Sequence, residues 1–378
     1  MKSLLVVLLA LTTLLEVMAK RRKRKRNKTY CNGVIGKAVG SLLAKNLIPL
    51  VPELRGGPSN ATVGRGARER VDELLRYVPP STAHSPLPKD FDPFQPELYY
   101  RFLTYASLAY FESMELIEKF SKTASPDFYT GNFSMINYFK GSGARHFDDH
   151  DAVYVITRND EQRVIVLAWR GSTTKSDFMC DARQTGAIAA HFRGSCPLPS
   201  GTRGVSWMKD FYVSEGMKES VPLFLLEQIK TQLLSALKEH SDYQVVLAGH
   251  SLAGVKAIFT AMYLHGEVPV SAVYTYGHMP FGSHIFTDNV VECLGPDRVV
   301  RVVSGGDLAP WSNAGSEIGH SELVKEVFSP SGTVGEWVVC QGALDEACSY
   351  GVPCEDKSFA DHGTFGGLAM GDIKLLLK

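Results

Sequence analysis

The stretch Val245-Val-Leu-Ala-Gly-His-Ser-Leu-Ala-Gly254 decides the fold of this chain. It opens with a continuous apolar run, which is typical of a strand covered on both faces. The small residues around Ser251 then predict a tight turn into a helix over 252–265. Such a turn exposes the serine hydroxyl at the carboxyl end of a sheet, in front of the positive end of the helix. The stretch therefore predicts a nucleophilic serine at position 251; the alternative is a tight turn with an incidental serine.

Strands and helices alternate around this stretch. Helical spacing of apolar residues predicts helices over 97–120 and 219–240. Apolar or β-branched runs predict strands over 152–157, 163–169, 243–248, 271–276, 298–303 and 322–328. The polar turn 158–162 joins the first two strands into an expected antiparallel hairpin. The alternation predicts an α/β fold with a mostly parallel central sheet and helices on both faces.

A nucleophilic serine needs a base, and the base needs a group that orients it. After a serine turn of this kind, the acid and then the histidine follow along the chain. Asp307 lies on a loop directly after an expected strand and is the predicted acid; the alternative is an ordinary loop aspartate. His362, among flexible residues near the C-terminus, is the predicted base. His320 is expected to be a buried, hydrogen-bonded residue, and His250 a structural one that points to the other side of its strand.

A second strand end supplies the expected oxyanion donors. Trp169-Arg-Gly-Ser172 closes the run 163–169 with a glycine and a small hydroxyl residue, so its backbone can approach a substrate closely. The backbone amides of Ser172 and Leu252 are the two predicted donors. The alternative for Ser172 is a merely polar strand end.

One further segment has the residue types of a metal site. His146-Phe-Asp-Asp-His150-Asp151 leads directly into an expected strand, so we expect a loop role for it. Neither a metal nor another cofactor is expected.

The segments named above together resemble the class 3, fungal-type lipases of the α/β-hydrolase fold. The matching pieces are Tyr105-Ala-Ser-Leu-Ala-Tyr110, Trp169-Arg-Gly-Ser172, Gly249-His-Ser-Leu-Ala-Gly254, Tyr274-Thr-Tyr-Gly277, Arg298–Pro310 and Asp361-His362. The resemblance covers residues 97–378. It implies a catalytic triad of Ser251, Asp307 and His362. It also implies an oxyanion hole formed by Ser172 and Leu252.

The resemblance also implies a lid over about 175–192. Within it, 185–192 is small and apolar, and Cys180 and Cys196 flank this part, so a bridge between them would tether it. The alternative is an ordinary surface helix. The chain departs from the family pattern at Ala253, where glycine is usual, and at Met279-Pro280, where proline and arginine are usual. These departures leave the substrate range open.

The resemblance implies a carboxylic-ester hydrolase that acts on acylglycerols through an acyl-enzyme, at a lipid–water interface. Four alternatives remain open. Three are enzymes that use the same chemistry: a phospholipase, a phenolic-ester esterase and an acyltransferase. The fourth is a secreted binding protein that keeps the fold without turnover.

The charges are unevenly placed along the chain. Of 40 basic and 40 acidic residues, eight bases and one acid lie in residues 1–26, which leaves 32 bases and 39 acids in the remainder. A mildly acidic body argues against a nucleic-acid partner. The content of 44% hydrophobic and 10% aromatic residues excludes a disordered protein.

Residues 1–19 have the layout of a secretory signal peptide. A basic start is followed by thirteen uncharged residues, 3–15, and by small or apolar residues before Lys20. The uncharged stretch is shorter than the ~20 residues that a spanning helix needs. We therefore expect secretion and no stable transmembrane anchor, with 20–96 as a basic and proline-rich arm or propeptide and 97–378 as the catalytic domain. The basic run 20–26 leaves an uncleaved membrane anchor or a nuclear address as alternatives.

Seven cysteines suit an oxidising compartment. Cys31 lies outside the main body and is the expected unpaired one. Cys340, Cys348 and Cys354 lack the spacing of a zinc site and are expected in disulfides, with the pairing open. Three glycosylation sequons agree with secretion, at Asn27, Asn60 and Asn132.

Overall fold

The computed structural model describes residues 84–123, 128–142, 151–173, 186–188, 212–311, 320–321, 323–331, 335–370 and 372–375, and single positions at 69, 72, 75, 76 and 377. Several expectations concern residues outside these ranges. They are the signal peptide 1–19, the basic run 20–26, Cys31, the sequons at 27 and 60, and the bridge between Cys180 and Cys196.

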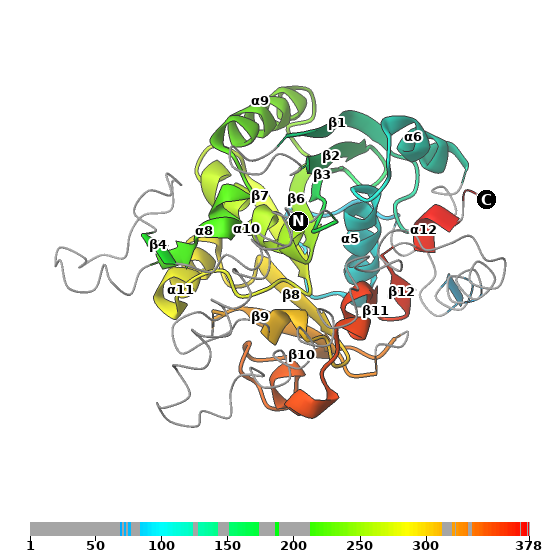
Figure 1. The fold of residues 1–378 in the computed structure, drawn as a ribbon. Helices are drawn as coiled ribbons and strands as arrows, with labels where there is room; N and C mark the ends of the chain where they lie inside the picture. Colours follow the sequence, from blue (N-terminus) through cyan, green and yellow to red (C-terminus); the bar gives the residue numbers. More distant parts are fainter. Residues whose placement is uncertain are drawn as a thin grey trace, which may run out of the picture.

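A sheet of eight strands forms the centre of the described part (Figure 1). In their order across the sheet the strands are β1 (Ser134–Ser142), β2 (Asp151–Asn159), β3 (Val164–Trp169), β6 (Gln244–His250), β7 (Val270–Tyr276), β8 (Val299–Ser304), β9 (Lys325–Ser329) and β10 (Val338–Val339). From β3 to β9 neighbouring strands are parallel, whereas β1, β2 and β10 pair antiparallel with their neighbours. The expected hairpin and the mostly parallel sheet are both confirmed.

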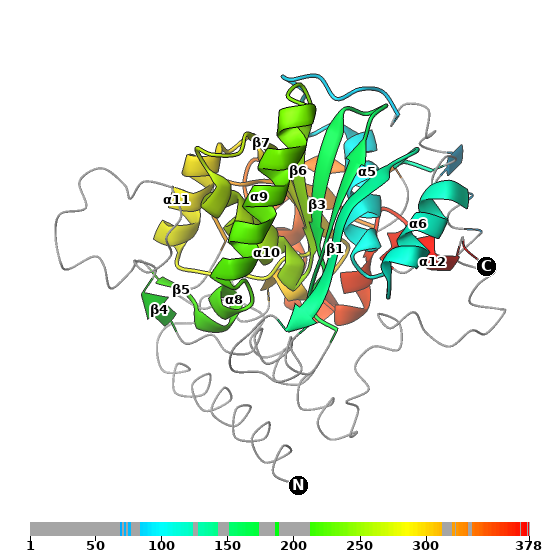
Figure 2. The same ribbon diagram turned by 90° about the horizontal axis from the view of Figure 1, so that it is seen from above.

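Helices cover both faces of the sheet (Figure 2). On one side lie α8 (Glu215–Glu219), α9 (Leu223–Glu239), α10 (Leu252–Leu264) and α11 (His284–Leu294). On the other side lie α5 (Pro96–Leu108), α6 (Met114–Thr123) and α12 (Asp372–Leu375). Two short two-stranded sheets are formed by β4 (Gly186–Ile188) with β5 (Tyr212–Ser214), and by β11 (Thr364–Phe365) with β12 (Leu368–Ala369). Four 3₁₀ turns complete the described elements, at Ala309–Trp311, Ser349–Gly351, Cys354–Asp356 and Phe359–Gly363.

The side chains of β6 show why this strand reads as a continuous apolar run. Successive side chains of a strand point to opposite faces of the sheet. Val245 and Leu247 belong to the apolar core under α9 and α10, whereas Val246 and Ala248 belong to the core under α5. Both sets are fully buried, so neither face of the strand tolerates polar side chains.

Two details of the helices differ from expectation. The helix expected over 97–120 is two helices, α5 and α6, because the chain turns at 109–113 and buries both Tyr110 and Phe111. Residues 98–108 of α5 are buried on every face, so this helix is not amphipathic. The edge strand β1 is not predicted from the sequence, because its mixed polarity and its irregular register between Met135 and Asn137 hide the alternation of a strand.

The proline-rich segment before α5 packs against the body of the protein. Leu87 is buried, and its N–H donates to the Gln162 carbonyl (2.8 Å). The Tyr274 hydroxyl donates to the Pro93 carbonyl (2.8 Å). Residues 84–95 therefore contact the folded body at two points. The domain boundary at 97 stays a prediction, and no helix in the described ranges is long and apolar enough to cross a membrane.

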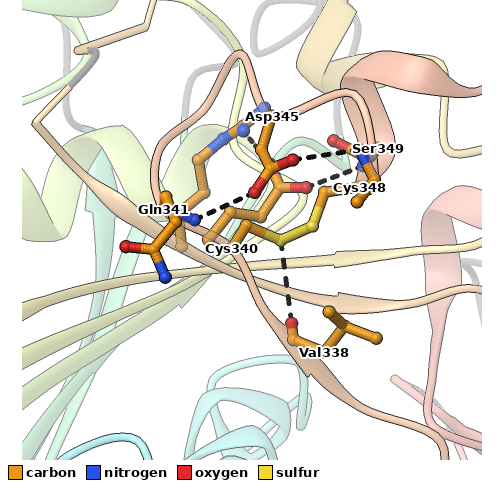
Figure 3. The surroundings of a disulfide bond; sticks show 9 residues. Val338, Cys340, Gln341, Asp345, Cys348 and Ser349 are labelled. Carbon is orange, nitrogen blue, oxygen red and sulfur yellow. Dashed lines mark hydrogen bonds and ion pairs between the residues drawn. A yellow bond between two sulfur atoms is a disulfide. The ribbon is translucent and has the colours of Figure 1, made fainter.

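A disulfide joins Cys340 to Cys348 and closes the loop after β10 (Figure 3). Inside this loop Asp345 accepts the Gln341 N–H (3.1 Å). Cys354 is also disulfide-bonded. The expectation that the three C-terminal cysteines form disulfides is thus confirmed.

A buried ion pair lies beside this loop. Arg301 on β8 and Glu326 on β9 are direct neighbours across the sheet, and both side chains are fully buried. Glu326 also accepts the Ser349 N–H (3.0 Å), and the Lys357 ammonium donates to the Ser349 carbonyl (2.6 Å). Burial lowers the pKa of Lys357 to about 8. These contacts fix the segment that leads to His362 onto the sheet.

The substitution Glu326→Ala should lower the free energy of unfolding by about 3–5 kcal/mol, because it leaves the Arg301 cation buried without a partner. The double variant Arg301→Met/Glu326→Leu should recover part of this loss. Urea unfolding monitored by circular dichroism measures both. The control is Glu112→Ala, which breaks an exposed pair with Lys374 and should cost less than about 1 kcal/mol. A loss at Glu326 no larger than this control would contradict the role assigned to the buried pair.

Candidate active site

Ser251 lies at the junction of β6 and α10, as expected. Its backbone has φ +61° and ψ −131°, a conformation that only a strained turn imposes on a serine. Its N–H donates to the Tyr276 carbonyl on the neighbouring strand (2.8 Å). The turn thereby aims the hydroxyl away from the sheet edge and in front of the first turn of α10.

Two glycines make room for this turn. A Cβ on Gly249 would lie 2.2 Å from the Ala253 carbonyl oxygen, and one on Gly254 would lie 2.7 Å from the Cβ of His278. Ala253 itself is fully buried in the apolar core. The methyl group of Ala253 is therefore accommodated. The position that requires glycine is 254.

The structure brings together the three side chains expected at the site. His362 Nε2 lies 2.8 Å from Ser251 Oγ, and His362 Nδ1 lies 3.1 Å from both carboxylate oxygens of Asp307. All three residues are buried, and Asp307 is 1% exposed. Asp307 Oδ1 also accepts the Ala309 N–H (2.9 Å), which helps to orient the carboxylate. Because Nδ1–H donates to a carboxylate, Nε2 is free to accept the serine proton.

The loop that carries Asp307 is bonded directly to the segment that carries His362. The Gly306 N–H donates to Asp361 Oδ2 (2.9 Å), and the Gly306 carbonyl accepts the Ser358 N–H (2.7 Å). Asp361, which lies next to His362 in the sequence, thus accepts a hydrogen bond from the loop of Asp307. The sequence did not reveal this contact. The N–H and the carbonyl of Gly306 are therefore both hydrogen-bonded to the segment that carries His362.

Gly277 is a second residue whose role only the structure reveals. It follows β7 with φ +60°, and a Cβ at this position would lie 2.5 Å from Asp307 Oδ2 and 3.1 Å from His362 Nδ1. The glycine thus leaves the space in which the carboxylate and the imidazole meet. The sequence signal was its place directly after an expected buried strand.

The two expected oxyanion segments lie beside Ser251. Leu252 is the first residue of α10, where backbone amides have no acceptor within the helix. Ser172 is buried just after β3. Its neighbour Gly171 faces the serine, since a Cβ on Gly171 would lie 3.3 Å from Ser251 Cβ and 2.4 Å from the His250 carbonyl oxygen. The backbone therefore approaches the serine closely at the strand end, as the glycine predicts.

Of the other histidines, His320 is as expected, and His250 makes contacts that no sequence pattern signals. His320 is buried and donates from Nε2 to the Pro310 carbonyl (2.6 Å). His250 is buried, and its ring lies beside the site: the centroids of the His250 and His362 rings are 4.6 Å apart. This contact joins two residues 112 positions apart in the sequence.

Two other expectations fall largely on residues outside the described ranges. Of the expected lid over 175–192, the structure describes 186–188 alone, which form β4 rather than a helix and pair with β5. Of the segment 146–151, it describes Asp151 alone, the first residue of β2. The lid and the loop role both stay predictions.

Comparison with known proteins shows which family this chain resembles. The sequence profile described as Lipase (class 3) matches residues 166–315, a range that contains Ser172, Ser251 and Asp307. This part of the chain is thus similar to the class 3 lipases. Phospholipase A1-Igamma2 of Arabidopsis thaliana is 29% identical over 248 residues, which cover 59% of this chain and 46% of that protein. A lipase of Rhizomucor miehei is 27% identical over 228 residues, which cover 59% of this chain and 57% of that protein.

Solved structures of lipases establish the fold. The Rhizomucor miehei lipase in its propeptide complex aligns with a TM-score of 0.55 and 22% identity, over 73% of this chain and 79% of that one. Lip2 lipase from Yarrowia lipolytica aligns with a TM-score of 0.56 and 19% identity, over 71% of this chain and 91% of that one. The expected α/β-hydrolase fold is thus confirmed. The chain spans about half the length of the curated relatives it matches, 46% and 47% of the two Arabidopsis phospholipases A1 of the Igamma type.

Gly277→Ala tests whether the space at Asp307 and His362 is needed. The new methyl would displace the carboxylate and imidazole, so turnover should fall by about 100-fold or more. Gly266→Ala is the matched control: its φ is +80° and its Cβ would meet no atom within 4 Å, so it carries the same backbone cost of about 1–2 kcal/mol without a clash. Ester hydrolysis and thermal unfolding of both variants are measured together. Equal turnover in the two variants would refute the steric argument.

Proposed function

We propose that this chain is a serine hydrolase of carboxylic esters that acts on acylglycerols, with Ser251 as nucleophile, His362 as general base and Asp307 as the acid that orients the histidine. The observation that carries the proposal is the continuous contact from Ser251 Oγ to His362 Nε2 and from His362 Nδ1 to Asp307, at 2.8 Å and 3.1 Å. An isolated buried serine would not need an imidazole that is itself held by a buried carboxylate.

In the proposed reaction, Ser251 Oγ attacks the ester carbonyl while its proton passes to His362 Nε2. The imidazolium formed is stabilised by Asp307, which is buried and accepts from Nδ1. The amides of Ser172 and Leu252 donate to the oxyanion, and the positive N-terminus of α10 adds to its stabilisation. His362 then returns the proton to the leaving alcohol, and water hydrolyses the acyl-enzyme by the same route.

A phospholipase is the second candidate. The support for it comes from three relatives, all phospholipases A1 of Arabidopsis thaliana, which are 29%, 24% and 28% identical to this chain. The chemistry at Ser251 would be the same for both substrates. The difference would lie in the residues that meet the third substituent of the glycerol.

Reaction with a fluorescent alkyl phosphonate tests the mechanism. Wild type should be labelled on Ser251, and Ser251→Ala should lose labelling and about 10⁶-fold of turnover. The control Ser271→Ala removes a hydroxyl that bonds Gln244 at the other end of the sheet, and should keep both. Folded wild-type protein that is not labelled would point to a binding protein instead.

A substrate panel separates the remaining candidates. Tributyrin, long-chain triacylglycerol, phosphatidylcholine and a feruloyl ester are compared at equal acyl concentration. A lipase should be most active on acylglycerols, with a rise in rate when tributyrin passes its solubility limit. Preference for phosphatidylcholine with release of the sn-1 acid would favour phospholipase A1, and preference for the feruloyl ester a phenolic esterase.

We also propose that the protein is secreted. The support is the apolar stretch 3–15 and the disulfide between Cys340 and Cys348, since such bonds persist in oxidising compartments. Expression of the full chain in a secreting eukaryotic host should yield protein in the medium that lacks residues 1–19. N-terminal sequencing checks the cleavage, and retention in cell membranes with an intact N-terminus would support an anchor instead.

A further inference from the structure

We infer that His250 and Tyr110 are positioning residues: a buried chain of hydrogen bonds through them holds the backbone of His362 and the end of β3 in place around Ser251. The inference rests on the proposed function, in which His362 is the base. Both positioning residues act through the segments that carry the reacting groups.

The first link holds the base. His250 Nε2 lies 2.7 Å from the backbone carbonyl of His362. Because a carbonyl only accepts, Nε2 must carry the proton. The side chain next to the nucleophile in sequence thus binds the main chain of the residue that activates it, although the two histidines are 112 residues apart.

The second link fixes the form of His250. Its Nδ1 lies 2.8 Å from the Tyr110 hydroxyl oxygen. With the proton on Nε2, Nδ1 of the neutral ring accepts, so the tyrosine hydroxyl donates to it. Burial and the adjacent His362 lower the pKa of His250 well below its usual range, which agrees with a neutral ring.

The third link reaches the strand end. The Gly171 N–H donates to the Tyr110 hydroxyl oxygen (3.2 Å). The hydrogen bonds therefore run in one direction, from Gly171 to Tyr110 to His250 to His362. Hydrogen bonds aligned in this way strengthen one another in a buried setting. The residue after Gly171 is Ser172, whose amide is a proposed oxyanion donor, so a single hydroxyl ties this strand end to the base.

The arrangement has a geometric purpose. His362 lies in a short 3₁₀ turn, Phe359–Gly363, which has little regular structure to hold it. Its ring must stay at 2.8 Å from Ser251 Oγ, and a displacement of about 1 Å can cost about 100-fold in rate. Asp307 holds the ring from one end, and His250 holds the backbone from the other.

Two substitutions at His250 separate its two links. His250→Gln places an amide N–H near the position of Nε2 and can still donate to the His362 carbonyl. His250→Asn places an amide near Nδ1 and can still meet Tyr110, but it cannot reach His362. We expect kcat for ester hydrolysis to fall about 100-fold in His250→Asn with KM within about threefold, and His250→Gln to recover at least tenfold of that loss.

Tyr110→Phe tests the network without changing His250. It removes one oxygen, and kcat should fall about 10–100-fold with little change in KM. The matched control is Tyr274→Phe, which removes a buried hydroxyl from the Pro93 carbonyl and should lower stability without lowering kcat. Equal kcat in Tyr110→Phe and Tyr274→Phe, or equal losses in His250→Asn and His250→Gln, would overturn the inference.

A readout independent of turnover completes the test. In wild-type protein labelled with ¹⁵N-histidine, the signals absent from His250→Gln are those of His250. They should show a neutral ring with its proton on Nε2 from pH 5.5 to 8, and Tyr110→Phe should disturb this state. A proton on Nδ1 in wild type would overturn the inference. Failure of the wild type to react with the phosphonate would overturn the proposed function instead.

Discussion

Ser251 passes from β6 into α10 with φ +61° and ψ −131°, a conformation that costs a non-glycine residue about 1–3 kcal/mol. The packing around it maintains this conformation: its N–H is bonded to Tyr276, and there is no room for a side chain at Gly249 or Gly254. Because β6 lies within a parallel set, next to β7, the turn opens at the edge where β7 and β8 also end. Gly277 and Asp307 follow those strands and therefore arrive at the same place.

The site also requires a histidine within hydrogen-bonding distance of Ser251, and no α-helix or strand carries it. The segment from 340 to 362 is built of short 3₁₀ turns rather than a long helix or strand. Groups outside it hold it in place: Glu326 accepts from Ser349, the Gly306 peptide bonds Ser358 and Asp361, and His250 donates to His362. The bonds made by Glu326 and His250 also satisfy buried polar groups that would otherwise cost free energy. The same contacts thus serve stability and position.

Residues near strand ends were the ones that the sequence predicted well. The apolar run before Ser251, the loop after β8 and the glycine after β3 each signal a strand end, and parallel strands end together. Ser251, Asp307 and Ser172 could therefore be predicted as site residues, together with the strand ends that carry them. His362 was predicted because it follows Asp307 along the chain. Chain order predicts which histidine acts as the base, but not how far its ring lies from Ser251. The contacts of His250, Gly277 and Asp361 were missed, since their partners lie on other segments and leave no periodic pattern.

The sequence by itself determined the alternation of strands and helices, the turn at Ser251 and the order of the reacting residues, because these depend on local apolar spacing and on small residues. It did not determine the break between α5 and α6 or the tautomer of His250. Only the tertiary structure decided those, since both depend on Tyr110 turning inward to meet an imidazole 140 residues away. A hydrogen bond between such distant groups fixes which way each side chain points, and local propensity carries no information about it.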